Sequence, residues 1–281
     1  MKSLNSGMEL IRCAETGEGY PFGDMVLHPI TVRDYAVFTT CSSALTLRLS
    51  MLPAAYAVMN YAQAIFAMAI NEDLSEEERT YFTKFMHLFA LSLGSSVDDI
   101  QIYTDAKDIT KLAAIVVKQT TAESEELVRF DTRQLGQIRE IIAALNGREI
   151  PDESENAELV EAEQDIKSSG VNTSLKADVE DLKASVAAYY KVRLRELDDW
   201  TVFEFEKARS AIERMTRCVI CGIGEAGGMV KYEKGNPFPS LFFDRIPENP
   251  ALINVNDFMR RVGGAVEMSD GLPGDLPMGI N

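Results

Sequence analysis

An uncharged run from Leu49 to Ile70, LSMLPAAYAVMNYAQAIFAMAI, limits how this chain can fold more than any other feature of its sequence. A run of this length either crosses a bilayer or is buried in protein, because its apolar side chains are costly to leave in water. Pro53, Asn60 and Gln63 interrupt the run, and no cluster of Lys or Arg marks one end as cytoplasmic. We therefore expect a buried or interfacial helix and no role in a membrane.

The N-terminal region, residues 1–96, is predicted to be helical after an irregular start. Glycines and a proline between Gly17 and Gly23 predict short extended pieces and turns over residues 1–28. Beyond them, apolar side chains recur at helical spacing. The predicted helices include Ala54–Ile70 and Glu76–Leu93, the latter starting at a capping box of Ser75 and Glu78.

Residues 97–150 predict a small α/β insert. Three short runs are rich in β-branched or aromatic residues and are separated by polar turns, which is typical of strands. These runs are IQIY from Ile100, LAAIVV from Leu112 and ELVRF from Glu126. Asp131 or Thr132 then caps a predicted helix that ends at Asn146-Gly147 and carries the apolar stripe Leu135, Ile138, Ile141, Ile142 and Leu145.

Two further segments precede the C-terminal tail. Residues 151–174 are rich in acids and poor in large apolar side chains, which indicates a solvated helix followed by a linker. Residues 175–235 are predicted to be a second helical region, in which apolar residues recur every three or four positions. Two helices should meet there near Trp200, and Asp199 is the expected cap of the second one.

The C-terminal tail, residues 236–281, is predicted to be irregular, because prolines at Pro237, Pro239, Pro247 and Pro250 exclude a long helix. Its aromatic residues are too apolar to remain in water, so the tail should dock on something. The candidate partner-binding residues are Trp200, Phe203, Pro237, Phe238, Leu241, Phe242 and Phe243. The expected fold is therefore mainly α, a helical bundle-like protein with a small α/β insert and an irregular Pro/Gly-rich C-terminal segment.

The charge balance limits the class of partner. The 281 residues include 44 acids and 28 bases, for a formal net charge of -16. Nucleic-acid binding needs clustered Lys and Arg, whereas the densest basic stretch, Lys191–Arg195, is followed at once by Glu196. We expect no nucleic-acid partner. Four scattered cysteines and an N-terminus without signal-peptide features predict a reducing cytoplasm.

The stretch CVICGIGEAGG, from Cys218 to Gly228, contains a Cys-x-x-Cys and a Gly-x-Gly-x-x-Gly. A dinucleotide fingerprint needs a strand before the glycines and a helix after them, but a helical pattern precedes this stretch and no long helix can follow it. Gly222 and Gly224 are expected to end the helix, with Gly227-Gly228 in the following turn. Cys218 and Cys221 are interpreted as packing residues.

No other constellation in the sequence predicts catalysis or a cofactor. A zinc site needs four ligands, and besides the cysteine pair only Cys13, Cys41, His28 and His87 remain, all dispersed through the first part of the chain. No Gly-x-Ser-x-Gly, His-Glu-x-x-His or P-loop pattern is present. We therefore assign no catalytic, metal-binding or cofactor-binding residue.

Four stretches carry a resemblance to a known group of proteins. They are YPFGDMVLHPITVRDYAVFTTCSSAL from Tyr20, DTRQLGQIREIIAALNG from Asp131 with the later PDE, WTVFEFEKARSAIERM from Trp200 and MVKYEKGNPFPSLFFDR from Met229. In this order they resemble proteins of the tail module of tailed phages and prophages of Gram-positive bacteria, whose genes lie near that of the tape-measure protein.

The resemblance implies a non-enzymatic protein of tail morphogenesis, most similar to a tail assembly chaperone. Such a protein would keep the tape-measure helix soluble in the host cytoplasm while tube subunits polymerise, and its partners would be tape-measure or tube subunits or a second copy of itself. The 12 methionines fit an adaptable apolar surface. Two alternatives stay open: a structural component retained in the phage tail or virion, and a small-molecule enzyme that uses the α/β insert.

Overall fold

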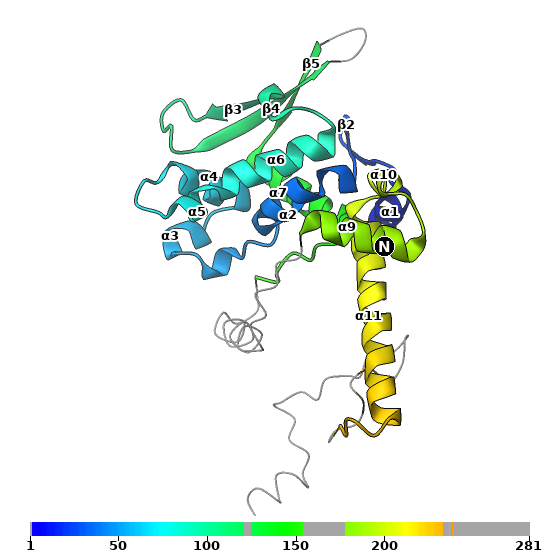
Figure 1. Cartoon of the computed structure of the whole chain (residues 1–281). Helices are drawn as coiled ribbons and strands as arrows, with labels where there is room; N and C mark the ends of the chain where they lie inside the picture. Colours follow the sequence, from blue (N-terminus) through cyan, green and yellow to red (C-terminus); the bar gives the residue numbers. More distant parts are fainter. Residues whose placement is uncertain (1, 121–124, 154–177, 233–235, 237, 239–281) are drawn as a thin grey trace, which may run out of the picture. The chain divides into compact units, whose positions relative to one another are not determined.

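The computed structural model describes residues 2–120, 125–153, 178–232, 236 and 238 (Figure 1). The chain divides into two compact units, Met1–Glu213 and Arg214–Asn281. A mainly α fold is confirmed, with a small sheet portion. The helices are α1 (Lys2–Thr16), α2 (Tyr35–Cys41), α3 (Ala54–Ala57), α4 (Tyr61–Ile70), α5 (Glu76–Arg79), α6 (Tyr81–Leu93), α7 (Thr132–Leu145), α9 (Val179–Tyr190), α10 (Leu194–Leu197) and α11 (Val202–Ala226).

The start of the chain is helical, so the prediction of extended pieces over residues 1–28 was wrong for α1. Cys13 and Ala14 of this helix are buried, and Gly17 ends it with a φ of 74°. The prediction holds after Gly17, where β1 (Tyr20–Phe22) and β2 (Met25–Leu27) form an antiparallel hairpin. The glycines and the proline therefore predict the turns from Gly17 onward, but they carry no information about the residues before Gly17.

The uncharged run does not form the single predicted helix Ala54–Ile70. The chain leaves α3 at Val58, and α4 begins after Asn60, whose side chain accepts a hydrogen bond from the backbone N–H of Gln63 at 3.0 Å. Asn60, read as a polar interruption, is a helix cap. In the part of the chain that the structure describes, no helix is long and apolar enough to cross a membrane.

The predicted capping box before α5 is confirmed, since Ser75 and Glu78 exchange side-chain to backbone hydrogen bonds. The helix predicted over Glu76–Leu93 is divided at Thr80 into α5 and α6. α6 buries Phe82, Phe85, Met86, Leu88 and Phe89. It packs against α4 through edge-to-face pairs of rings, of which Tyr61 with Phe85 has centroids 5.4 Å apart.

The three predicted strands are confirmed as β3 (Ile100–Thr104), β4 (Leu112–Thr120) and β5 (Glu125–Phe130). They form an antiparallel sheet in the order β3-β4-β5, so β4 is central (Figure 1). The ring of Phe130 at the end of β5 meets Phe89 of α6 with centroids 5.5 Å apart. This contact helps join the sheet to the helices.

Helix α7 lies at the centre of the first unit, because it contacts α1, α4, α6 and β4. It begins at the predicted cap, where Asp131 accepts hydrogen bonds from two backbone N–H groups. The predicted stripe is confirmed, since all five of its residues are buried: Leu135, Ile138, Ile141, Ile142 and Leu145. After the helix, Gly147 takes a φ of 66°, as expected of a residue that ends a helix.

Helix α11 starts at Thr201, so the prediction that Asp199 caps it was wrong. The Thr201 hydroxyl accepts from the N–H of Glu204 at 3.1 Å, and the Glu204 carboxylate accepts from the N–H of Thr201 at 3.0 Å. This reciprocal pair is a capping box. The Thr201 hydroxyl also donates to the carbonyl of Ala14 at 2.8 Å, which ties α11 to α1.

The far end of α11 also departs from the prediction. Gly222 and Gly224 lie inside the helix, which continues to Ala226, so the expectation that they end it was wrong. The turn at Gly227-Gly228 is confirmed, and Gly228 takes a φ of 67°. Two glycines weaken a helix without stopping it, whereas a positive φ does stop it. The acidic segment from residue 154 and most of the C-terminal tail lie outside the described residues.

Thr201→Ala tests the corrected start of α11. The change removes a helix cap and leaves the buried carbonyl of Ala14 without its donor, so we expect a loss of about 2 kcal/mol in the free energy of unfolding. Asp199→Ala is the matched control. Asp199 makes an exposed ion pair with Arg33, and its loss should cost less than about 0.5 kcal/mol. Urea unfolding followed by circular dichroism measures both; equal losses would argue against Thr201 as the cap.

Candidate functional site

Two of the predicted partner-binding residues, Trp200 and Phe203, have contacts within the chain. Trp200 is half-buried against the core, and its ring meets Tyr190 with centroids 5.8 Å apart. Phe203 is half-buried and lies so close to Gly147 that a Cβ there would be 2.9 Å from its ring. Their role in partner binding stays a prediction.

Phe238 belongs to the second unit, where the guanidinium of Arg217 lies 5.7 Å from its ring centroid. Its backbone N–H donates to the side chain of Asn236 at 2.8 Å. The other predicted partner-binding residues, Pro237, Leu241, Phe242 and Phe243, lie outside the described residues. Of the seven predicted residues, the structure therefore describes Trp200, Phe203 and Phe238.

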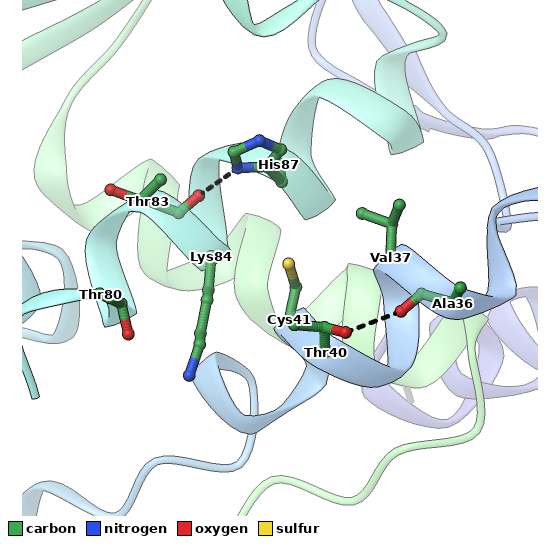
Figure 2. A pocket seen from close by; sticks show the side chains of 8 residues that line it. All are labelled: Ala36, Val37, Thr40, Cys41, Thr80, Thr83, Lys84 and His87. Atoms are coloured by element: carbon green, nitrogen blue, oxygen red, sulfur yellow. Dashed lines mark hydrogen bonds between the residues drawn. The ribbon is translucent and has the colours of Figure 1, made fainter. Parts of the chain in front are cut away.

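An apolar groove lies between α2 and α6 in the first unit, and we call it the α2–α6 groove (Figure 2). Its volume is about 550 Å³, within the range of ligand and side-chain pockets. Figure 2 shows the two helices and, as sticks, the side chains that line the groove. They are Ala36, Val37, Thr40, Cys41, Thr80, Thr83, Lys84 and His87.

The α2–α6 groove contains a thiol, an imidazole and an ammonium group, which invites comparison with a catalytic site. Burial raises the pKa of the Cys41 thiol despite the nearby charge of Lys84, so the thiol stays protonated near neutral pH. A ring nitrogen of His87 is 2.8 Å from the carbonyl oxygen of Thr83 in its own helix. The Lys84 ammonium lies over the Tyr81 ring and near the Ser43 hydroxyl. This arrangement suits apolar contact rather than nucleophilic attack.

The small size of the lining residues shapes the groove. Ala36 and Thr40 are one turn apart on α2, and Thr80 and Thr83 stand at the start of α6. Small side chains on two neighbouring helices allow a third helix to approach closely. The Thr40 hydroxyl donates to the carbonyl of Ala36 at 2.9 Å, so its polar atom is satisfied and its methyl group can face the groove.

A second apolar surface lies on the last turns of α11 in the second unit. Val219, Ile220 and Ile223 are 53%, 64% and 61% exposed, and by helical periodicity they form one stripe. Arg217, three residues before Ile220, contacts Phe238, whereas Glu225, which accepts from Asn236 at 3.1 Å, lies on the other side of the helix by the same periodicity.

The strongest cluster of charged groups is structural. The Tyr35 hydroxyl donates to Glu206 at 2.5 Å, and Arg209 donates to the same carboxylate at 2.7 Å. Burial alone would raise the pKa of Glu206, but these bonds and the nearby Arg148 outweigh it and hold the pKa below its usual range. The cluster joins α2 to α11.

No group of three or more His, Cys, Asp or Glu side chains that could hold a metal is found in the described part of the chain. Cys218 and Cys221 are free and half-buried on α11. Comparison with known proteins found no matching family model, no matching curated protein and no matching solved structure.

Sequence reasoning missed the α2–α6 groove. The one signal for it was the pattern of small residues at Ala36, Thr40 and Thr83 on helices otherwise rich in aromatic residues. Such a pattern shows that a helix has a face with little bulk. It does not show that two such faces line one groove, because that depends on how the helices pack.

The reactivity of Cys41 provides a test of the groove's chemistry. Because burial raises the pKa of its thiol, iodoacetamide at pH 8 should alkylate Cys41 more slowly than the half-buried Cys218 and Cys221. Raising the pH should accelerate the reaction at Cys41, since the thiolate fraction grows. Mass spectrometry of peptides measures each rate. Preferential alkylation of Cys41 at pH 7 would contradict this assignment and favour an activated thiol.

Proposed function

We propose that this protein is a non-enzymatic phage tail morphogenesis protein, a tail assembly chaperone that binds the tape-measure protein in the host cytoplasm. The proposal combines the sequence resemblance with one structural observation, the α2–α6 groove. That groove is apolar, open and lined by small side chains from two helices. These properties suit the docking of an amphipathic helix, which places apolar side chains from successive turns into such a groove.

The chemistry of the groove favours binding over catalysis. The Cys41 thiol is held neutral, and His87 contacts a carbonyl of its own helix. A general base needs a perturbed group within reach of a substrate proton, and a nucleophile needs an adjacent base. Apart from Cys41 and His87, the residues that line the groove supply methyl and hydroxyl groups and a single ammonium at Lys84. An apolar helix with an acidic residue near Lys84 would complement both features.

Co-expression with the tape-measure protein of the same phage or prophage tests the proposal. The tagged wild-type chain should capture the tape-measure protein from lysate and keep it in the soluble fraction. Val37→Asp places a charge in the groove, and we expect capture to fall at least about tenfold, because a buried unpaired carboxylate is strongly disfavoured. Quantitative mass spectrometry of the eluate measures the loss.

Val58→Asp is the matched control, since the same change falls on a residue that is 85% exposed and does not line the groove. It should capture as the wild type does. If the wild-type chain captures no tape-measure protein, the proposed function is wrong; if both variants capture normally, the groove is not the binding site. Finding the chain in purified phage particles at stoichiometric levels would instead favour the alternative, a structural component retained in the tail.

A further inference from the structure

Strand β3 is an edge of the three-stranded sheet, because β4 is its only partner among the described strands. In an antiparallel pair, every second residue turns its backbone N–H and C=O away from the neighbouring strand. The residues from Gln101 to Thr104 are exposed, with Ile102 at 46% and Tyr103 at 48%. Backbone groups along this edge are therefore open to a further strand.

The two edges of this sheet differ in how they are protected. Native proteins guard exposed edge strands with charged residues, proline or bulges, because an unguarded edge recruits other strands. β5 has the sequence EELVRF, with charges at three of its six positions. β3 has the sequence IQIYT, with neither a charge nor a proline, and its single irregularity lies at the far end, between Tyr103 and Thr104. The charges of the β5 sequence therefore disfavour the addition of a further strand at that edge, whereas the β3 sequence has no such charge.

The residues that flank β3 indicate the charge of the strand that fits there. Asp98 and Asp99 directly precede β3. After β3, the charges of Asp105 and Asp108 are balanced by those of Lys107 and Lys111, and Asp108 is 3.2 Å from Lys111. Lys118 of β4 is the next residue along the ladder and comes opposite Asp99, so the beginning of β3 has two acids against one base and stays negative, whereas its end is locally neutral. A partner strand with a basic residue beside Asp98 would be complementary.

A second copy of this chain fits the edge poorly. An antiparallel pair of two β3 strands centred on Ile102 would place the negative beginning of each copy beside the locally neutral end of the other, so a second copy does not supply an excess of basic charge beside Asp98. A parallel pair would place each aspartate beside its own counterpart. The net charge of -16 adds a general repulsion between copies. The occupant is expected to come from a different, basic chain.

We propose that β3 binds an extended, basic segment of another protein by strand addition, so that the partner becomes a fourth strand of the sheet. Main-chain hydrogen bonds would supply affinity, and Ile102 and Tyr103 would contact alternate side chains of the partner. The α2–α6 groove has no part in this inference, which stands or falls separately from the proposed chaperone function.

Two synthetic peptides test the proposal with the full-length protein. The probe is the fluorescently labelled, end-capped peptide KTVTVTVK, and its acidic counterpart is ETVTVTVE. Fluorescence anisotropy should show binding of KTVTVTVK and at least about tenfold weaker binding of ETVTVTVE. Hydrogen exchange should show that the peptide protects the backbone amides of residues 101–104 from exchange. Protection confined to β5, or equal affinity for both peptides, would overturn the proposal.

Variants at the two sheet edges provide a matched pair. Ile102→Lys places a charge on the open edge and should weaken binding of KTVTVTVK about tenfold or more. Leu127→Lys makes a comparable change on β5, at a residue that is 64% exposed, and should bind as the wild type does. If Ile102→Lys does not fold by circular dichroism, Gln101→Lys on the same edge replaces it. Unchanged binding by a folded β3 variant, or self-association of the wild type through β3, would refute the inference.

Discussion

The buried guanidinium of Arg139 joins α7 to the segment that connects α2 and α3. Arg139 is 5% exposed on α7, and it donates to the carbonyls of Leu45 and Leu47 at 2.8 and 2.6 Å. Its guanidinium carbon lies 4.0 Å from the ring centroid of Tyr61, whose hydroxyl donates to the carbonyl of Ala44 at 2.7 Å. A buried cation needs such partners, and the carbonyls between α2 and α3 need donors. The carbonyls accept the hydrogen bonds that the buried guanidinium must donate, and the guanidinium supplies the donors that the carbonyls need. Helices α7 and α4 and this connecting segment are therefore fixed together.

Much of the fold could be predicted, because its signals are local. The stripe on α7, the cap at Asp131 and the capping box at Ser75 each depend on residues within a turn or two. The errors have local causes too. The glycines from Gly17 onward predicted turns, although the residues before Gly17 form a helix that ends there. Asp199 was preferred as the cap of α11 because aspartate is a common cap, whereas the cap is the capping box formed by Thr201 and Glu204.

The candidate site could not be predicted in the same way, because it depends on the packing of distant helices. Ala36 and Thr83 line one groove only because α2 and α6 lie side by side, and nothing in either helix specifies that. The open edge of β3 is different. Its lack of charge is visible in the sequence, but only the strand order identifies it as an edge. The uncharged sequence of β3 thus suggests a binding function only when the strand order shows that β3 lies at an edge of the sheet.

The hydrogen bond from Thr201 to Ala14 spans 187 positions of the chain, and that from Ile30 to Asn146 spans 116. During synthesis, the first helix leaves the ribosome long before the residues that complete its contacts. Helix α1 packs against α7, so its apolar face stays in water until the polypeptide has been made beyond Leu145, and the hydrogen bond that ties it to α11 needs Thr201. Closing such long loops costs conformational entropy before the contacts repay it. Nascent chains truncated before Thr201 should lack the hydrogen bond that ties α1 to α11 and should fail to complete their core.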